Sequence, residues 1–163
     1  MRVGVVGHRY LTAEGAAFTA RMCARLLFDI RASHSRTTAL SALAEGADTL
    51  FASAAVALGV PLDIIQPHDD YRSDFRSSTA LAAYDRLVAK ARHRRLLPYR
   101  QRSDAAYQTA MRLVADDCDV LAVVWDGYPS KSVGGTADTV RYARARGRAV
   151  VHLNPLETKL SVG

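Results

Sequence analysis

Three glycine-containing segments hold the residues best suited to chemistry in this sequence. The first reads Gly7-His8-Arg9, the second Glu45-Gly46-Ala47-Asp48, and the third Gly134-Gly135-Thr136-Ala137-Asp138. In the third segment, main-chain N–H groups at a helix start and one threonine hydroxyl form a cradle suited to a phosphate. Asp126-Gly127 closes the preceding apolar run and is expected to lie beside that cradle. These segments together indicate a site for a phosphorylated small molecule.

Charged side chains in these segments have individual candidate roles. Arg9 is a candidate second phosphate contact, because a guanidinium matches the geometry of a phosphate. Glu45 has no evident capping role, so it is a candidate base or a ligand of ribose hydroxyls. Asp48 is either a ribose contact or the N-cap of a helix. Asp126 is expected to line the pocket.

Each segment also has a purely structural interpretation. Gly7 and Gly46 allow tight turns where strands end, although Gly7 also lets the main chain approach a ligand and Gly46 opens a helix whose N–H groups suit an anion. Thr136 is a suitable N-cap, and Asp138 complements the positive end of a helix dipole. The third segment favours function over this interpretation, because it falls where the predicted fold places ligands.

The elements that position these residues follow from the hydrophobic pattern. Apolar runs predict strands at residues 2–7, 37–43, 62–66, 94–99, 120–125 and 149–153. Helical spacing predicts helices at residues 13–33, 48–58, 79–92, 104–117 and 136–146. This alternation predicts right-handed βαβ crossovers and hence a three-layer, Rossmann-like α/β fold with a mainly parallel sheet. Ligands bind at the carboxyl ends of the strands in such sheets.

The length of 163 residues predicts one domain. We expect it to span residues 1–155, with residues 156–163 as a frayed C-terminal tail. Residues 67–78 are polar and alternate in charge, which predicts a surface loop.

Composition narrows the classes of partner. The formal net charge is +6, and 19 of the 22 basic residues are arginines. Such a balance suits nucleic acid, an anionic membrane surface or a phosphorylated small molecule. No run approaches the ~20 apolar residues that span a bilayer, and the N-terminus resembles a strand and not a signal peptide. A cytoplasmic protein without a membrane partner is therefore expected.

Other reactive residues give weaker signals. Cys23 and Cys118 are expected to be buried free thiols, and neither belongs to a CxxC pair. The five histidines lack metal-ligand spacing, so no metal and no cofactor is predicted. Arginine-rich stretches at residues 86–102 and 141–148 are typical of solvated faces, although Tyr99 and Tyr107 near the first would allow base stacking.

Three motifs taken in order resemble the SLOG superfamily, which includes relatives of the DNA-processing protein DprA and the LOG nucleotide phosphoribohydrolases. They are Val6-Gly7-His8-Arg9, Leu43-Ala44-Glu45-Gly46-Ala47-Asp48, and Val123-Val124-Trp125-Asp126-Gly127 followed by Gly134-Gly135-Thr136-Ala137-Asp138. The resemblance covers about residues 2–154. It implies a Rossmann-like fold, a nucleotide or nucleotide-derived ligand and a homo-oligomer, with the phosphate on Gly134-Gly135-Thr136.

The sequence departs from the catalytic LOG motif PGGxGTxxE. With Gly135-Thr136 laid on the GT pair, the glutamate position falls on Thr139, and the leading Pro-Gly-Gly positions fall on residues 131–133. Asp138 stands one residue early and so points about 100° around the helix from the expected acid.

Three functional hypotheses follow. The first is binding of a nucleotide or nucleotide-derived ligand. The second is N-glycoside hydrolysis or transfer on a nucleoside monophosphate, with Glu45 and Asp138 as the main catalytic candidates and Asp126 as a third. The third is single-stranded nucleic-acid binding, which ranks below the others because basic and aromatic residues do not interleave.

Overall fold

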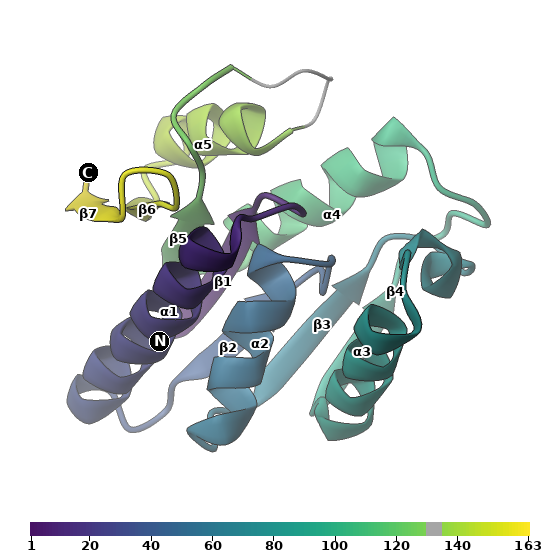
Figure 1. Cartoon of the computed structure of the whole chain (residues 1–163), viewed down its shortest axis with the longest axis horizontal. Coiled ribbons are helices and arrows are strands. Elements are labelled where there is room, and N and C mark those ends of the chain that lie inside the picture. Colours follow the sequence, from purple (N-terminus) through teal and green to yellow (C-terminus); the bar gives the residue numbers. More distant parts are fainter. Residues whose placement is uncertain (130–134) are drawn as a thin grey trace.

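One β-sheet runs through the residues that this computed structural model describes, which are 1–129 and 135–163 (Figure 1). Across those residues its strand order is β4-β3-β2-β1-β5-β6-β7. Adjacent strands from β4 to β6 pair in parallel, and β7 pairs with β6 in the antiparallel sense. The strands are β1 (Arg2–Gly7), β2 (Thr38–Ser41), β3 (Leu62–Gln66), β4 (His93–Leu96), β5 (Val120–Val124), β6 (Ala149–Asn154) and β7 (Lys159–Val162).

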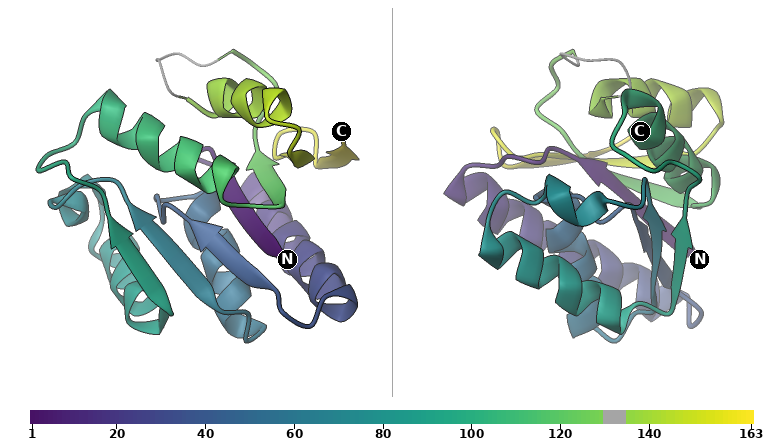
Figure 2. Two further views of the ribbon diagram at one scale, coloured as in Figure 1. Left: turned by 180° about the vertical axis from the view of Figure 1, so that it is seen from behind. Right: turned by 90° about the vertical axis from the view of Figure 1, so that its right-hand side faces the viewer.

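Helices cover both faces of this sheet and complete three layers (Figure 1 and Figure 2). The helices are α1 (Ala13–Ser33), α2 (Ala47–Ala57), α3 (Ser78–Lys90), α4 (Asp104–Asp116) and α5 (Thr136–Ala145), and Tyr71–Asp74 form a 3₁₀ turn, η1. On one face of the sheet, α1, α2 and α3 pack into the core through Phe18, Phe51 and Leu87. Val114 and Val140 carry α4 and α5 into the core on the other. The predicted fold class is confirmed.

Local capping signals explain where several helices begin and end. The Thr12 hydroxyl accepts a hydrogen bond from the Gly15 N–H at 3.0 Å, and Ser103 caps α4 through the Ala106 N–H at 3.1 Å. Each satisfies a main-chain donor that a helix leaves unpaired at its start. Gly59 follows α2 with a φ of +66°, the left-handed conformation that ends a helix.

The direction of chain progression reverses at β1. From β1 the chain steps outward through β2 and β3 to β4, and it then returns through α4 to place β5 on the other side of β1. Gly7 and Val124 are paired at the carboxyl ends of β1 and β5. A crevice at such a reversal is the usual ligand position in doubly wound sheets.

Two sequence-based expectations are wrong in part. Residues 67–78 are not wholly a surface loop, because His68 and Tyr71 are fully buried and η1 forms within the segment. The exposed residues of the segment include Asp69, Asp70 and Arg72. The tail is not frayed throughout, because Lys159–Val162 form β7 and pair with β6. None of the helices in the described ranges combines the length and hydrophobicity that crossing a bilayer requires.

Candidate functional site

A cleft of about 670 Å³ lies at the carboxyl edge of the sheet, at the reversal between β1 and β5. Its lining comes from the end of β1, from the segments that follow β1, β2, β3 and β5, and from the N-terminal parts of α2, α4 and α5. Several residues singled out from the sequence line it: Gly7, His8, Arg9, Asp48, Asp126, Gly135 and Thr136. Residues from all three glycine-containing segments therefore meet in one cleft.

Gly46 and Ala47 do not line the cleft, but they pack on the main chain of His8 and Arg9, which do. Gly46 has a φ of +91°, and a Cβ on it would lie 2.3 Å from the Arg9 carbonyl oxygen and 2.6 Å from that of His8. The Ala47 N–H donates to the His8 carbonyl at 3.1 Å. The start of α2 is thus packed directly on the segment that carries Arg9, and the Ala47 amide is engaged by that segment.

The remaining predicted site residues lie elsewhere. Glu45 and Gly127 are not among the residues that line the cleft. Asp138 forms an ion pair with Arg141 and lines a small depression beside Gln108 and Tyr142, between α4 and α5. Gly134 lies outside the described residues.

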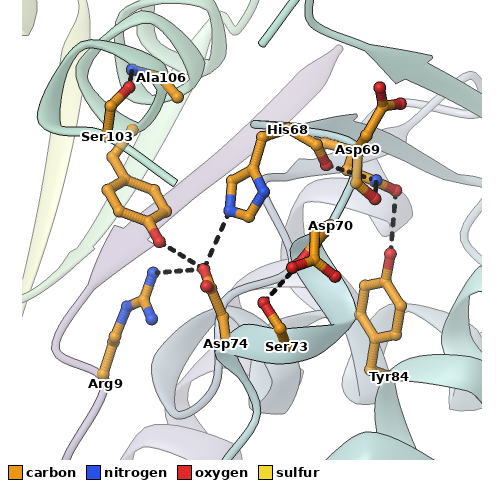
Figure 3. Close-up of polar contacts among 11 residues, drawn as sticks. Arg9, His68, Asp69, Asp70, Ser73, Asp74, Tyr84, Ser103 and Ala106 are labelled. Atoms are coloured by element: carbon orange, nitrogen blue, oxygen red, sulfur yellow. Dashed lines mark hydrogen bonds and ion pairs between the residues drawn. The ribbon is translucent and has the colours of Figure 1, made fainter. Parts of the chain in front are cut away.

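Arg9 belongs to a cluster that the sequence did not predict (Figure 3). Its Nη2 lies 3.8 Å from Oδ2 of Asp74, and the same oxygen lies 3.3 Å from His68 Nε2 and accepts a hydrogen bond from the Tyr107 hydroxyl. The Arg9 guanidinium also lies over the Tyr107 ring, 4.9 Å from its centroid, which is a cation–π contact. Residues from the ends of β1 and β3 and from α4 therefore converge on one carboxylate.

Burial and neighbouring charges shift the pKa values in this cluster. Burial alone would lower the pKa of Arg9, but Tyr71, Tyr107 and Asp74 raise it above its ordinary value. Burial, the hydrogen bond to Asp74 and the charge of Asp74 raise the pKa of Tyr107 to about 12. At neutral pH Arg9 is therefore a cation and Tyr107 a neutral donor.

Asp48 is a buried acid that lines the cleft. It lies in the first turn of α2 and accepts a hydrogen bond from Ser41 Oγ at 2.9 Å. Burial raises its pKa to about 6, against the lowering effects of Ser41, nearby backbone N–H groups and Arg9. Asp48 therefore changes from a hydrogen-bond donor to an acceptor near pH 6 and is mostly an acceptor at neutral pH.

His8 and Asp126 form the pair between the first and third segments. The His8 Nε2 lies 3.2 Å from an Asp126 carboxylate oxygen, and the Tyr128 N–H donates to the same oxygen at 3.1 Å. Burial would raise the pKa of Asp126, but the Tyr128 amide and His8 outweigh it and lower the pKa. Asp126 is therefore an ionised acceptor in the cleft.

Aromatic residues surround the cleft on several sides. Tyr71 and Tyr107 are in its interior part, whereas Tyr10 and Tyr128 line it with 60% and 67% of their surfaces exposed. Trp125 holds the Tyr128 main chain through a hydrogen bond from its indole N–H to the carbonyl, at 2.7 Å. Exposed tyrosine rings at a cleft offer flat apolar surfaces on which a planar ring stacks.

Comparison with known proteins rests on structure alone. No family model and no curated protein matches the sequence. The structure of DNA processing protein A (DprA) from Streptococcus pneumoniae superposes with a TM-score of 0.65 at 21% identity, over 93% of this chain. That of DNA processing protein A from Helicobacter pylori, described for its single-stranded DNA binding mode, has a TM-score of 0.67 at 16% identity, also over 93% of this chain.

A third solved structure, the structural-genomics target TM1055, has a TM-score of 0.56 at 14% identity and covers 91% of this chain and 71% of its own. This chain spans about half of the Streptococcus pneumoniae protein (49%) and 64% of the Helicobacter pylori protein. These likenesses show the fold. The chain shares its Rossmann-like α/β fold with these three structures.

Proposed function

We propose that this chain binds a nucleotide or nucleotide-derived ligand in the cleft, with a phosphate at the start of α5. The observation that carries the proposal is the meeting of Arg9, the first residues of α5 and exposed aromatic rings in one cleft. Gly135 and Thr136 at the start of α5 both line it. The positive end of a helix dipole favours a phosphate at this position. The cleft volume falls in the range of small-molecule sites.

Other parts of a nucleotide find chemically matched partners in the same cleft. Arg9 is the second phosphate contact, and Asp126 and Asp48 are acceptors for ribose hydroxyls. The rings of Tyr10 and Tyr128 provide stacking surfaces for a base. Base stacking is tolerant of base identity, so the aromatic residues support a nucleotide without selecting its base.

The proposed function is binding of the nucleotide without cleavage of its glycosidic bond. Glycosidic cleavage through an oxocarbenium-like transition state needs a carboxylate close to the anomeric carbon. Of the three carboxylates predicted to serve in it, Glu45 and Asp138 do not line the cleft, and Asp126 does. Release of free base from the nucleotides tested below would support the hydrolase hypothesis through Asp126.

A charge placed at the start of α5 tests the phosphate position. Gly135→Asp should lower the affinity for AMP at least tenfold, about 1.4 kcal/mol or more, because a carboxylate there repels the phosphate. Gly135 has an extended conformation (φ −75°, ψ 179°) that any residue adopts, and Asp is a good N-cap. The variant is therefore expected to fold. Calorimetry with AMP, ADP-ribose and cyclic nucleotides is the measurement.

Gly135→Asn is the matched control, because it has the same shape and capping ability without the charge. Adenosine is the ligand control, since it has no phosphate and its binding should respond equally to both variants. Equal AMP affinity in the two variants would place the phosphate elsewhere. Absence of binding of every compound to the wild-type chain would refute the proposed function.

Single-stranded DNA is a second candidate, favoured by the Helicobacter pylori neighbour and by the distribution of arginines. Arg94 and Arg95 are exposed on the edge strand β4, and Arg100 and Arg102 are exposed between β4 and α4. This stretch leads into the α4 turn where Tyr107 lines the cleft. A single DNA strand bound along these arginines would place its phosphate backbone on a basic surface that leads toward the aromatic rings.

Salt dependence tests the second candidate. The affinity for a labelled 20-nucleotide oligo(dT), measured by fluorescence anisotropy, should fall at least tenfold between 50 and 200 mM salt. The double variant Arg94→Gln/Arg95→Gln should weaken binding and reduce the log–log salt slope by about 1.4. Arg21→Gln/Arg36→Gln is the control, because it removes the same charge from two exposed positions, one in the middle of α1 and one just after it. Equal losses in both double variants would indicate a general effect of net charge and no defined DNA path.

A further inference from the structure

Asp74 lies behind the cleft rather than in it. Its side chain is 3% exposed, and it is absent from the cleft lining, whereas its partners Arg9 and Tyr107 are both in that lining. Asp74 comes from the end of η1, and it contacts Arg9 from the loop after β1 (Figure 3). It also accepts a hydrogen bond from Tyr107 of α4. One buried carboxylate thus links two cleft residues that are 98 positions apart in sequence.

The contacts of this carboxylate are unevenly distributed. Its Oδ2 receives Arg9, His68 and Tyr107, whereas the buried Oδ1 has no hydrogen-bond partner among the described residues. An unsatisfied buried acceptor costs stability, and such groups in native structures call for an explanation. One explanation is that the carboxylate fixes the positions of two donors at a ligand cleft. Binding sites tolerate a loss of stability where the geometry of the bound ligand depends on such fixed groups.

Arg9 would otherwise be a poor recognition group. An arginine side chain has many rotamers, and ordering it at the moment of binding reduces affinity. The Asp74 carboxylate and the face of the Tyr107 ring restrict the guanidinium from two directions before any ligand arrives. The Tyr107 ring is itself held, because its hydroxyl donates to Asp74.

We infer that Asp74 is a positioning residue that pre-orders Arg9 and Tyr107 for the phosphate of a nucleotide, an inference that rests on the proposed function. His68 supports the carboxylate from the side opposite to solvent, because it is fully buried and contacts the same oxygen. The raised pKa of Tyr107 agrees with a hydroxyl that donates to a charged acceptor. Asp74 acts through its neighbours and touches no ligand itself.

The variant Asp74→Asn tests this inference, since it keeps the shape of the side chain and removes its charge. AMP affinity, measured by calorimetry, should fall about tenfold. The Tyr107 pKa, followed by NMR with ¹³Cζ-labelled tyrosine and assigned with Tyr107→Phe, should move down from its raised value. Asp70→Asn is the matched control, because Asp70 is an exposed acid at the start of the same turn. Neither quantity should change in that variant.

A double-mutant cycle separates positioning from a general structural effect. Arg9→Gln/Asp74→Asn should lose less AMP affinity than the sum of the two single losses, because part of the effect of Asp74 passes through Arg9. Additive losses, or an unchanged Tyr107 pKa in Asp74→Asn, would overturn the inference. If Asp74→Asn does not fold, Tyr107→Phe takes its place in the double-mutant cycle with Arg9→Gln, because it removes one donor to the same oxygen. Non-additive losses of AMP affinity would again support the inference, and additive losses would overturn it. Should wild-type protein bind no nucleotide, the proposed function fails, while the Tyr107 pKa still decides whether Asp74 holds Tyr107.

Discussion

Gly46→Ala is expected to lower the free energy of unfolding by about 3 kcal/mol or more. Two costs combine at this position. The φ of +91° is a conformation that residues with a Cβ rarely adopt, and the added Cβ would lie 2.3 Å from the Arg9 carbonyl oxygen. That oxygen belongs to the main chain, so it cannot move away as the end of a flexible side chain would. Urea unfolding followed by circular dichroism is the measurement.

Gly147→Ala is the control for the conformational cost alone. Gly147 has a φ of +67°, and within the described residues no atom lies within 4 Å of a Cβ built on it. Its substitution should cost about 1 kcal/mol. A Gly46→Ala cost as small as that of Gly147→Ala would contradict the close packing of α2 on the segment that follows β1.

The Gly46 contact also connects stability with binding. The carbonyl groups that a Cβ would meet belong to His8 and Arg9, which both line the cleft. Any relief of the clash displaces the segment that carries the Arg9 guanidinium. Gly46→Ala protein that still folds should therefore bind AMP more weakly, although Gly46 does not line the cleft. The second glycine segment thus serves the site by packing and not by contacting a ligand.

Most of the fold was predictable because its signals are local. The strands at residues 2–7 and 62–66 and the helix at residues 13–33 are found where the hydrophobic pattern placed them. Buried parallel strands leave continuous apolar runs, and polar caps mark helix starts, so both are visible in short windows of sequence. The alternation of strands and helices predicted a mainly parallel sheet, and with it the edge at which the glycine segments meet.

The Asp74 cluster was not predictable in the same way. Asp74 stands among Asp69, Asp70, Arg72 and Arg76, and such a charge pattern is typical of a solvated loop. What buries it is the packing of Tyr71 and His68 under this segment, which depends on α4 and on the loop after β1. The available signal was position: the segment follows the carboxyl end of β3, on the edge of the sheet where the site lies.

Strand β7 was missed for a related reason. Its residues alternate between polar and apolar over only four positions, which is the shortest run that indicates a half-buried strand, and all four are exposed. It is held by main-chain pairing with β6, from Val151 with Val162 to Asn154 with Lys159. Pairing of this kind depends on an edge that the rest of the sheet must first provide. Edge strands with little burial are consequently the elements that sequence patterns indicate least.

Asp48→Asn is expected to remove a pH dependence of stability that the buried acid imposes. Burial raises the pKa of Asp48 from 3.8 to about 6 in the folded chain. Between these values the folded state binds more protons than the unfolded state, so ionisation of Asp48 lowers the free energy of unfolding as pH rises. The loss is complete above the folded pKa and amounts to about 3 kcal/mol. Asparagine does not titrate, and it therefore lacks this contribution.

The quantity to measure is the difference in free energy of unfolding between wild type and Asp48→Asn, from urea titrations at pH 4, 5, 6, 7 and 8. Wild type should become less stable relative to the variant by about 2.4 kcal/mol from pH 4 to pH 7, with little further change at pH 8. Taking the difference cancels the groups that the two proteins share. Asp70→Asn is the control, because substitution of an exposed acid changes stability by about 0.5 kcal/mol or less. A flat difference for Asp48→Asn would mean that Asp48 is hydrated in solution, and the cleft would then lack the buried acid that lies beside Arg9.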